Sequence, residues 1–121
     1  MLNKNTLVIG ASENPARYSN MAILALRKHQ HDVVALAKRD GSVFDVFFQT
    51  KFPLNENIHT ITLYIGKKWQ AEYYKSILEL KPERVIFNPG AENFEFAEML
   101  EENGIEAIEA CTLVMLSTKQ Y

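Results

Sequence analysis

Hydrophobic positions along the chain alternate between short continuous runs and longer segments with a helical period. Short apolar, β-branched runs are typical of strands, and apolar residues three and four positions apart are typical of amphipathic helices. Strands are predicted at 6–9, 32–37, 46–48, 58–65, 84–87 and 105–109, and helices at 20–29, 69–80 and 93–103. The segment 112–117 is compatible with a further short helix.

This alternation predicts an α/β fold with a mainly parallel sheet between two layers of helices. Right-handed crossovers give a Rossmann-like three-layer α/β/α sandwich, most simply with strand order 3-2-1-4-5-6. No repeat, linker or low-complexity segment interrupts the pattern, so we expect a single domain over residues 1–121. Ligands of such sheets bind outside the carboxyl ends of the strands, where the turns after these strands converge.

Local signals set several element boundaries. Ser19 is a candidate N-cap, and Tyr18 before it could pack against Ile23. Pro82 ends the second predicted helix, and Gly104 ends the third. The segment 41–57 is the least regular, with a turn near Pro53, and its phenylalanines are expected to be core or lid residues: Phe44, Phe47, Phe48 and Phe52.

Composition excludes several classes of protein. A chain of 121 residues can bury roughly two-thirds of its unfolded surface without a metal or a disulfide. A net charge of -2 argues against a general nucleic-acid binder. One cysteine cannot form an internal disulfide, and no Cys/His cluster has metal-ligand spacing. Because no apolar run approaches a membrane span or a secretory leader, we expect a cytoplasmic protein without membrane contact.

The first turn has the features of an anion site. Gly10 ends the first strand, and glycine allows the backbone to turn sharply and approach a ligand. The helix that follows directs unpaired N–H groups and its positive dipole end at the same place. The dinucleotide fingerprint requires two further glycines, but this chain has Ser12 and Pro15 in the same turn.

Basic residues fall in the turns that should converge at the carboxyl edge, namely Arg17, Lys38, Arg39, Lys67 and Lys68. They either form a cradle for a polyphosphate or are basic side chains in exposed loops. An NAD site would place a carboxylate after the second strand to bind the ribose hydroxyls. The lysine and arginine found there favour a phosphate on the adenosine ribose, which NADP and coenzyme A both carry.

Three segments carry a resemblance to a known family. Gly10-Ala11-Ser12, followed by Pro15, Arg17 and Ser19, resembles the first turn of the coenzyme A-binding domain family. Asn88-Pro89-Gly90-Ala91 resembles the second glycine turn of that family, and Glu109-Ala110-Cys111 resembles its closing segment. The resemblance covers nearly the whole chain and implies a Rossmann-like domain similar to the N-terminal domain of the succinyl-CoA synthetase alpha subunit.

The resemblance implies coenzyme A or an acyl-CoA as a small-molecule nucleotide ligand, with phosphate at Ser12 and Arg17 and the pantetheine arm over Pro89-Gly90-Ala91. Family members usually carry Val-Asn-Pro where this chain has Leu36-Ala37-Lys38-Arg39. Serine also satisfies local backbone groups in ordinary turns, and the second glycine turn could be a plain connection. The candidate cofactor-binding residues are Gly10, Ala11, Ser12, Pro15, Arg17, Tyr18, Ser19, Lys38, Arg39, Ile65, Pro89, Gly90, Ala91 and Cys111.

Catalysis has little support in the sequence. His29, His31 and His59 lie away from the predicted site, and Glu92 and Glu109 are expected to be a helix first-turn carboxylate and an exposed strand end. In the synthetase the phosphohistidine lies in a second domain, which we do not expect within these 121 residues. We therefore expect coenzyme A binding without catalysis. The alternatives are an NADP-dependent oxidoreductase or redox-sensing domain, and a ligand-free interaction domain; the sequence identifies no protein partner.

Cys111 has two interpretations. A free cysteine is most often a small buried hydrophobic residue. At the start of a terminal helix, its thiolate would instead be favoured by the helix dipole, and it could exchange reversibly with oxidised coenzyme A.

Overall fold

The computed structural model describes residues 2–121, which form one sheet with helices on both faces. The strands are β1 (Thr6–Ile9), β2 (Val33–Leu36), β3 (Ser42–Val43), β4 (Val46–Gln49), β5 (Thr60–Leu63), β6 (Arg84–Phe87) and β7 (Glu106–Glu109). The helices are α1 (Tyr18–Lys28), α2 (Lys67–Gln70), α3 (Tyr74–Leu80), α4 (Phe94–Glu102) and α5 (Thr112–Ser117), with a 3₁₀ turn at Ala71–Tyr73.

The strand order is β3-β4-β2-β1-β5-β6-β7. All neighbours are parallel except β3, which pairs antiparallel with β4 in a hairpin at the edge. The predicted α/β class and the order 3-2-1-4-5-6 are therefore confirmed, and β3 is an additional edge strand. This architecture is Rossmann-like.

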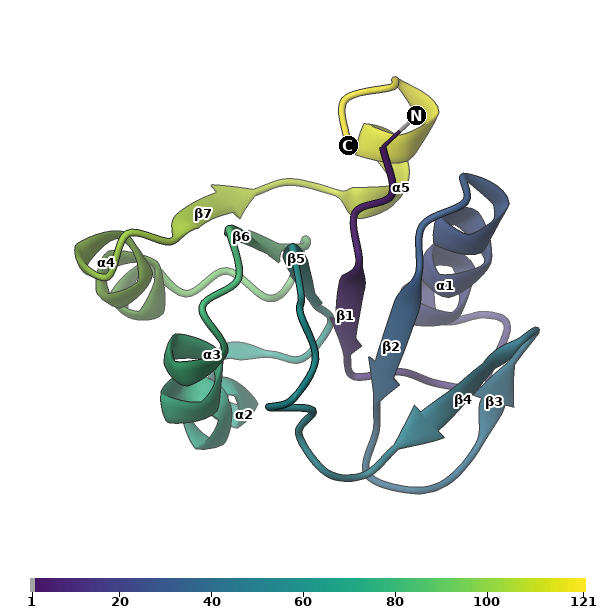
Figure 1. Cartoon of the computed structure of the whole chain (residues 1–121), viewed down its shortest axis with the longest axis horizontal. Helices are drawn as coiled ribbons and strands as arrows, with labels where there is room; N and C mark the ends of the chain where they lie inside the picture. The colour runs from purple at the N-terminus through teal and green to yellow at the C-terminus, as the bar shows by residue number, and fades with distance from the viewer. Residues whose placement is uncertain (1) are drawn as a thin grey trace.

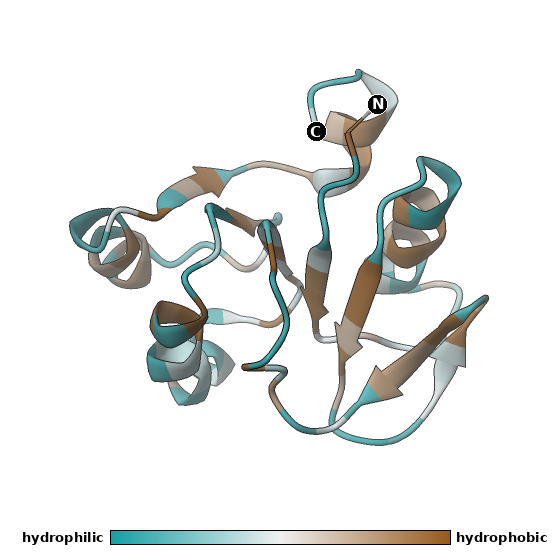
Figure 2. Ribbon diagram, in the orientation of Figure 1, coloured by the Kyte–Doolittle hydropathy of each residue, from teal (hydrophilic) through white to brown (hydrophobic). Residues whose placement is uncertain are grey.

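Two apolar layers pack on the sheet because successive strand residues face opposite sides. Leu7 and Ile9 face the layer formed by α3 and α4, which contribute Ile77 and Phe96. Val8 faces the layer formed by α1 and α5. Figure 1 shows these helix pairs on opposite sides of the sheet, and Figure 2 shows the hydrophobic residues concentrated on the central strands. No helix within residues 2–121 combines the length and hydrophobicity needed to cross a membrane.

The first helix begins earlier than predicted. Arg17, with extended backbone, is the N-cap of α1, and Ser19 lies buried inside the first turn rather than capping it. Tyr18 is exposed and Ile23 is buried, so the predicted packing of Tyr18 against Ile23 is wrong. The early start follows from the loop before the helix, where Asn14 accepts the N–H groups of Ala16 and Arg17 and turns the chain into α1.

The segment 41–57 contains the predicted strand and the turn near Pro53, but two of its four phenylalanines are not core residues. Phe44 and Phe47 are 76% and 77% exposed, because the first lies at the hairpin tip and the second on the outer face of β4. Phe48 and Phe52 are half-buried. Figure 2 shows the hydrophobic hairpin tip at the edge of the sheet.

The second predicted helix, over 69–80, is interrupted. A 3₁₀ turn separates α2 from α3, and Trp69 is exposed whereas its neighbour Gln70 is buried. The Gln70 amide donates to the carbonyls of Ile65 at 3.0 Å and Ala91 at 2.7 Å. This buried amide joins the loops after β5 and β6. Because Gln70 points inward, Trp69 points to solvent, and the predicted apolar face of the helix 69–80 does not include Trp69.

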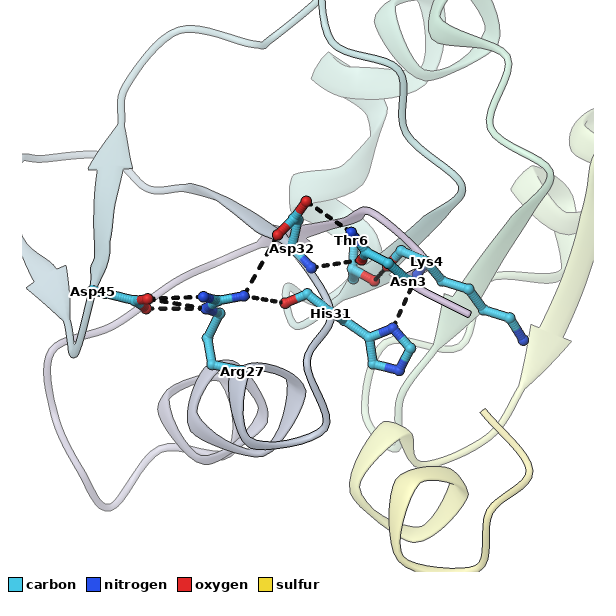
Figure 3. A network of polar contacts seen from close by, with 7 residues as sticks. All are labelled: Asn3, Lys4, Thr6, Arg27, His31, Asp32 and Asp45. Carbon is cyan, nitrogen blue, oxygen red and sulfur yellow. Dashed lines mark hydrogen bonds and ion pairs between the residues drawn. The ribbon is translucent and has the colours of Figure 1, made fainter. Parts of the chain in front are cut away.

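A polar network joins β1, α1, β2 and the β3–β4 hairpin (Figure 3). The Arg27 guanidinium donates to both carboxylate oxygens of Asp45 at 2.9–3.2 Å and to the carbonyl of His31 at 2.8 Å. The Lys4 N–H donates to Nδ1 of His31 at 3.0 Å. These contacts lie near the start of β1, away from the carboxyl edge of the sheet.

His31 provides a pH-dependent contribution to stability. Its side chain is 2% exposed, and burial lowers the pKa of His31 below its ordinary value of 6.5. The unfolded chain takes up a proton at this residue as the pH falls through 6.5, whereas the folded protein takes it up only at a lower pH. We therefore expect the free energy of unfolding to fall as the pH falls below that value.

The variant His31→Asn should reduce this acid destabilisation, because asparagine keeps an acceptor near the Lys4 N–H without a titrating ring. Urea unfolding of both proteins at about pH 7.5 and about pH 5.5 measures the effect. An equal loss of stability in both proteins would show that His31 does not contribute to it.

Candidate functional site

The first turn brings the ends of three strands together at Gly10. Its φ is +95°, and a Cβ at this position would lie 2.8 Å from Cγ2 of Ile65 and 3.2 Å from the backbone of Tyr64. The N–H groups of Gly10 and Ala11 both donate to the carbonyl of Leu36 at 3.1 Å. The turn after β1 is thus tied to β2 and packed against β5, so it needs glycine for both conformation and space.

The rest of the loop is held by its own polar side chains. The hydroxyl of Ser12 accepts the N–H of Asn14 at 3.1 Å, and the carbonyl of Ser12 accepts from the Asn20 side chain at 3.0 Å. The Ser12 hydroxyl therefore satisfies a local backbone group, and Ser12 also lines two cavities. The loop delivers Arg17 to the N-terminus of α1.

Three adjoining cavities lie along the carboxyl edge of the sheet. The first, of about 390 Å³, lies beside the turns after β1 and β2. Aromatic side chains of Phe48 and Tyr73 line it together with the apolar residues Leu36 and Ile65. Its remaining lining residues are Gly10, Ala11, Ser12, Glu13, Asn14, Ala37, Lys38, Arg39 and Asp40.

Charges of both signs surround the first cavity. Lys38 donates to Glu72 at 3.0 Å, and this hydrogen bond raises the pKa of Lys38. Arg39 supplies a second cation. The Glu13 carboxylate accepts the N–H of Ser42 at 2.9 Å, and Asp40 also lines the cavity. This cavity can therefore bind a ligand with both phosphate and hydroxyl groups, because cations and acceptors lie side by side.

The second cavity, of about 560 Å³, lies at the N-terminus of α1. The N–H groups of Asn20 and Met21 donate to the carbonyl of Arg17, which leaves those of Tyr18 and Ser19 as the unpaired donors of the helix start. The first turn of α1 carries no acidic residue. The lining residues are Gly10, Ser12, Ala16, Arg17, Tyr18, Ser19, Tyr64, Ile65, Gly66, Pro89, Gly90 and Ala91.

The third cavity, of about 220 Å³, is lined mostly by apolar groups: Tyr18, Tyr64, Asn88, Pro89, Cys111 and Leu113. It shares three of these residues with the second cavity, which in turn shares Gly10, Ser12 and Ile65 with the first. We call the three together the groove. Its lining comes from the turns after β1, β2, β5, β6 and β7, so the predicted convergence of these turns is present in the structure.

Buried hydrogen bonds of Asn88 hold the far end of the groove. Its amide nitrogen donates to the Thr62 hydroxyl at 2.7 Å and to the carbonyl of Leu63 at 2.9 Å, and its oxygen accepts the N–H of Thr112 at 2.9 Å. The Tyr64 hydroxyl is buried beside the hydroxyls of Thr62 and Thr112 without hydrogen-bond geometry to either. Burial raises the pKa of Tyr64 to about 12.

The structure places every candidate cofactor-binding residue on the groove except Pro15. Lys67 and Lys68 are not among the lining residues; Lys68 instead lies over the ring of its neighbour Trp69, at 4.9 Å from the centroid. Glu92 precedes α4 rather than lying in its first turn, and its carboxylate accepts the N–H of Gly90 at 2.9 Å. Cys111 is half-buried at the N-cap of α5.

Sequence reasoning missed several lining residues, namely Glu13, Phe48, Tyr64, Tyr73, Asn88 and Leu113. Asn88 directly follows the predicted strand 84–87, and Tyr64 lies at the end of the predicted strand 58–65, so their position at the carboxyl edge was a usable signal. Phe48 ends the predicted strand 46–48, so it carried the same signal and was expected only as a core or lid residue. Tyr73 carried no such signal, because its place on the groove depends on the 3₁₀ turn.

A family model described as a CoA binding domain matches residues 4–117. The chain belongs to the CoA binding domain family. The match spans all seven strands and the turns that line the groove. The predicted resemblance is thereby confirmed.

Several solved structures share the fold of this chain. The crystal structure of an uncharacterized protein is 42% identical, with a TM-score of 0.96 and full coverage of both chains. A protein from Thermus thermophilus is 20% identical with a TM-score of 0.86, covering 98% of this chain and 91% of that chain. A hypothetical protein from Pyrococcus horikoshii OT3 is 20% identical with a TM-score of 0.87, covering 96% and 83%. A search of curated proteins found no match.

Removing the Asn88 amide should destabilise the protein strongly. Asn88→Ala leaves the Thr112 N–H and the Leu63 carbonyl buried without a partner, at a cost of about 3 kcal/mol in the free energy of unfolding. Asn55→Ala is the matched control, because Asn55 is exposed in a loop. Urea unfolding measures both, and equal effects would mean that the Asn88 contacts contribute no more than a surface residue does.

Proposed function

We propose that the chain binds coenzyme A or an acyl-CoA in the groove and does so without catalysing a reaction. The observation that carries the proposal is the polarity of the groove, which changes along its length in the same order as the ligand. Charged and aromatic residues lie at one end, unpaired N–H groups and Arg17 in the middle, and apolar residues at the other end. Membership of the CoA binding domain family supports this ligand class.

The second cavity suits the pyrophosphate. The N–H groups of Tyr18 and Ser19 and the positive end of the α1 dipole favour an anion there. Arg17 and Ser12 line the same cavity, and their side chains can add charge-assisted and neutral hydrogen bonds. The fixed loop conformation means that little ordering is needed on binding.

The first cavity suits the adenosine end. Phe48 and Tyr73 offer aromatic surfaces for the base, and Lys38 and Arg39 offer cations for the ribose phosphate. Because Lys38 already pairs with Glu72, we assign the larger share of phosphate binding to Arg39. The carboxylate of Glu13 can accept a ribose hydroxyl.

The second glycine turn suits the pantetheine arm. Gly90 has a φ of +94°, and a Cβ there would project into open space rather than into the protein. Its N–H is taken by Glu92, so the backbone contact available from this turn is a carbonyl. A ligand running past Pro89 from the second cavity reaches the third.

Binding without chemistry is supported by the residues that line the groove. Within the described chain, no histidine lies on any of the three cavities, and Cys111 has no ring nitrogen or carboxylate beside it on the third cavity. One oxygen of the Glu13 carboxylate accepts the Ser42 N–H, and the proposed binding mode places the other on a ribose hydroxyl. No group of three or more metal-ligating side chains occurs among residues 2–121.

Coenzyme A should raise the melting temperature more than NAD does, because NAD lacks the ribose phosphate that Lys38 and Arg39 can bind. A ligand at 100 times its Kd adds about 2.7 kcal/mol to the free energy of unfolding. Thermal unfolding with coenzyme A, acetyl-CoA, NAD and NADP at equal concentrations makes the comparison. Equal shifts with coenzyme A and NAD would contradict the assignment, and a larger shift with NADP would favour the oxidoreductase alternative.

Arg17→Glu should weaken coenzyme A binding by on the order of 2 kcal/mol, because it removes a charge-assisted contact and adds a repulsion at the pyrophosphate. Lys75→Glu is the control, because Lys75 is exposed on α3 and this substitution makes the same change in net charge. Isothermal titration calorimetry gives both affinities. If the two variants bind equally well, the pyrophosphate does not lie at the first turn.

A further inference from the structure

We propose that the third cavity holds the acyl chain of a short- or medium-chain acyl-CoA, so that the preferred ligand is a thioester with an apolar tail rather than free coenzyme A. This inference rests on the proposed function, because it takes the rest of the ligand to lie in the first and second cavities. It adds an assignment for the part of the groove that phosphate and pantetheine do not need.

The lining of the third cavity is unlike that of the other two. No charged side chain lines it, whereas the second cavity carries Arg17 and the first carries Lys38 and Arg39. Pro89 and Leu113 contribute apolar walls, and the rings of Tyr18 and Tyr64 contribute flat ones. Such a surface gains free energy by covering a hydrocarbon and gains little from a second phosphate.

The position of the cavity selects its occupant. It shares Tyr18, Tyr64 and Pro89 with the second cavity, so it opens where a pantetheine arm that passes the second glycine turn would end. The group attached to that end of an acyl-CoA is the acyl chain. A ligand with a charged or bulky polar group there would have to desolvate it against an apolar wall, which is unfavourable.

The walls are held in place by the fold. Leu113 lies in the first turn of α5, whose start is fixed by the Asn88 contact to the Thr112 N–H and by the hydrogen bond of 2.8 Å between the hydroxyls of Thr62 and Thr112. Leu116 of the same helix packs into the layer beside α1. The cavity is therefore a formed feature of the structure, and an acyl chain can enter it without first ordering the protein.

The volume of the third cavity limits the length of the acyl chain that fits inside it. A cavity of about 220 Å³ accommodates roughly seven groups of the size of a water molecule or a methylene, at about 30 Å³ for each. Acyl chains of up to about six or seven carbons should fit inside, and longer chains should extend into solvent. Each methylene that is fully buried can raise the affinity by about fourfold.

The test measures affinity across a series of ligands by isothermal titration calorimetry: coenzyme A, acetyl-CoA, butyryl-CoA, hexanoyl-CoA and decanoyl-CoA. We expect the affinity to rise through hexanoyl-CoA and then level off. A flat series in which coenzyme A itself binds would overturn the acyl assignment and leave the proposed function standing. If no member binds, the proposed function fails and this inference fails with it.

Variants of Leu113 give a second readout, namely the ratio of hexanoyl-CoA to coenzyme A affinity. Leu113→Trp fills the cavity and should bring this ratio close to one, and Leu113→Ala enlarges it and should move the plateau to longer chains. Val114→Ala is the matched control, because Val114 is the next residue of α5, is 54% exposed and does not line the cavity. If both Leu113 variants keep the wild-type affinity ratio and the wild-type plateau, the acyl chain of the ligand does not lie in the third cavity.

Discussion

The close approach of Gly10 to the end of β5 is the constraint on which the groove depends. A Cβ at this position would lie 2.8 Å from Ile65, and the same turn uses two N–H groups to hold the carbonyl of Leu36. Three neighbouring strands, β2, β1 and β5, therefore end at the same level, and from β1 the chain continues to α1. The first and second cavities meet at this point, so a ligand that spans both must cross the glycine.

Buried amides hold the other walls of the groove, and sequence reasoning did not predict their burial. Asn88 joins β5, β6 and the start of α5, and Gln70 joins the loops after β5 and β6. Asparagine and glutamine are mostly surface residues, so nothing in their spacing indicated burial. The glycine turns could be predicted because φ and close approach restrict the residue type, whereas the lining position of Leu113 follows from the packing of α5.

The order of the sheet was predictable because buried parallel strands read as β-branched runs and helices as apolar repeats. The two-residue strand β3 left no such pattern, and the exposed Phe44 and Phe47 of its hairpin resembled core residues. The start of α1 was misplaced because Ser19 has the residue type of an N-cap, while the capping position is taken by Arg17 and determined by the loop before it. Tertiary contacts, rather than local propensity, determined the position of β3, the exposure of Phe44 and Phe47, and the start of α1.

The central claim, that a nucleotide ligand lies along the groove, is tested most directly by mapping amide chemical shifts of the isotope-labelled protein during titration with coenzyme A. The account predicts shifts at Gly10, Tyr18, Ser19 and Gly90, at the carboxyl edge of the sheet, and none around His31 at the opposite edge. Shifts confined to the region of His31, or no shifts at saturating ligand, would contradict it.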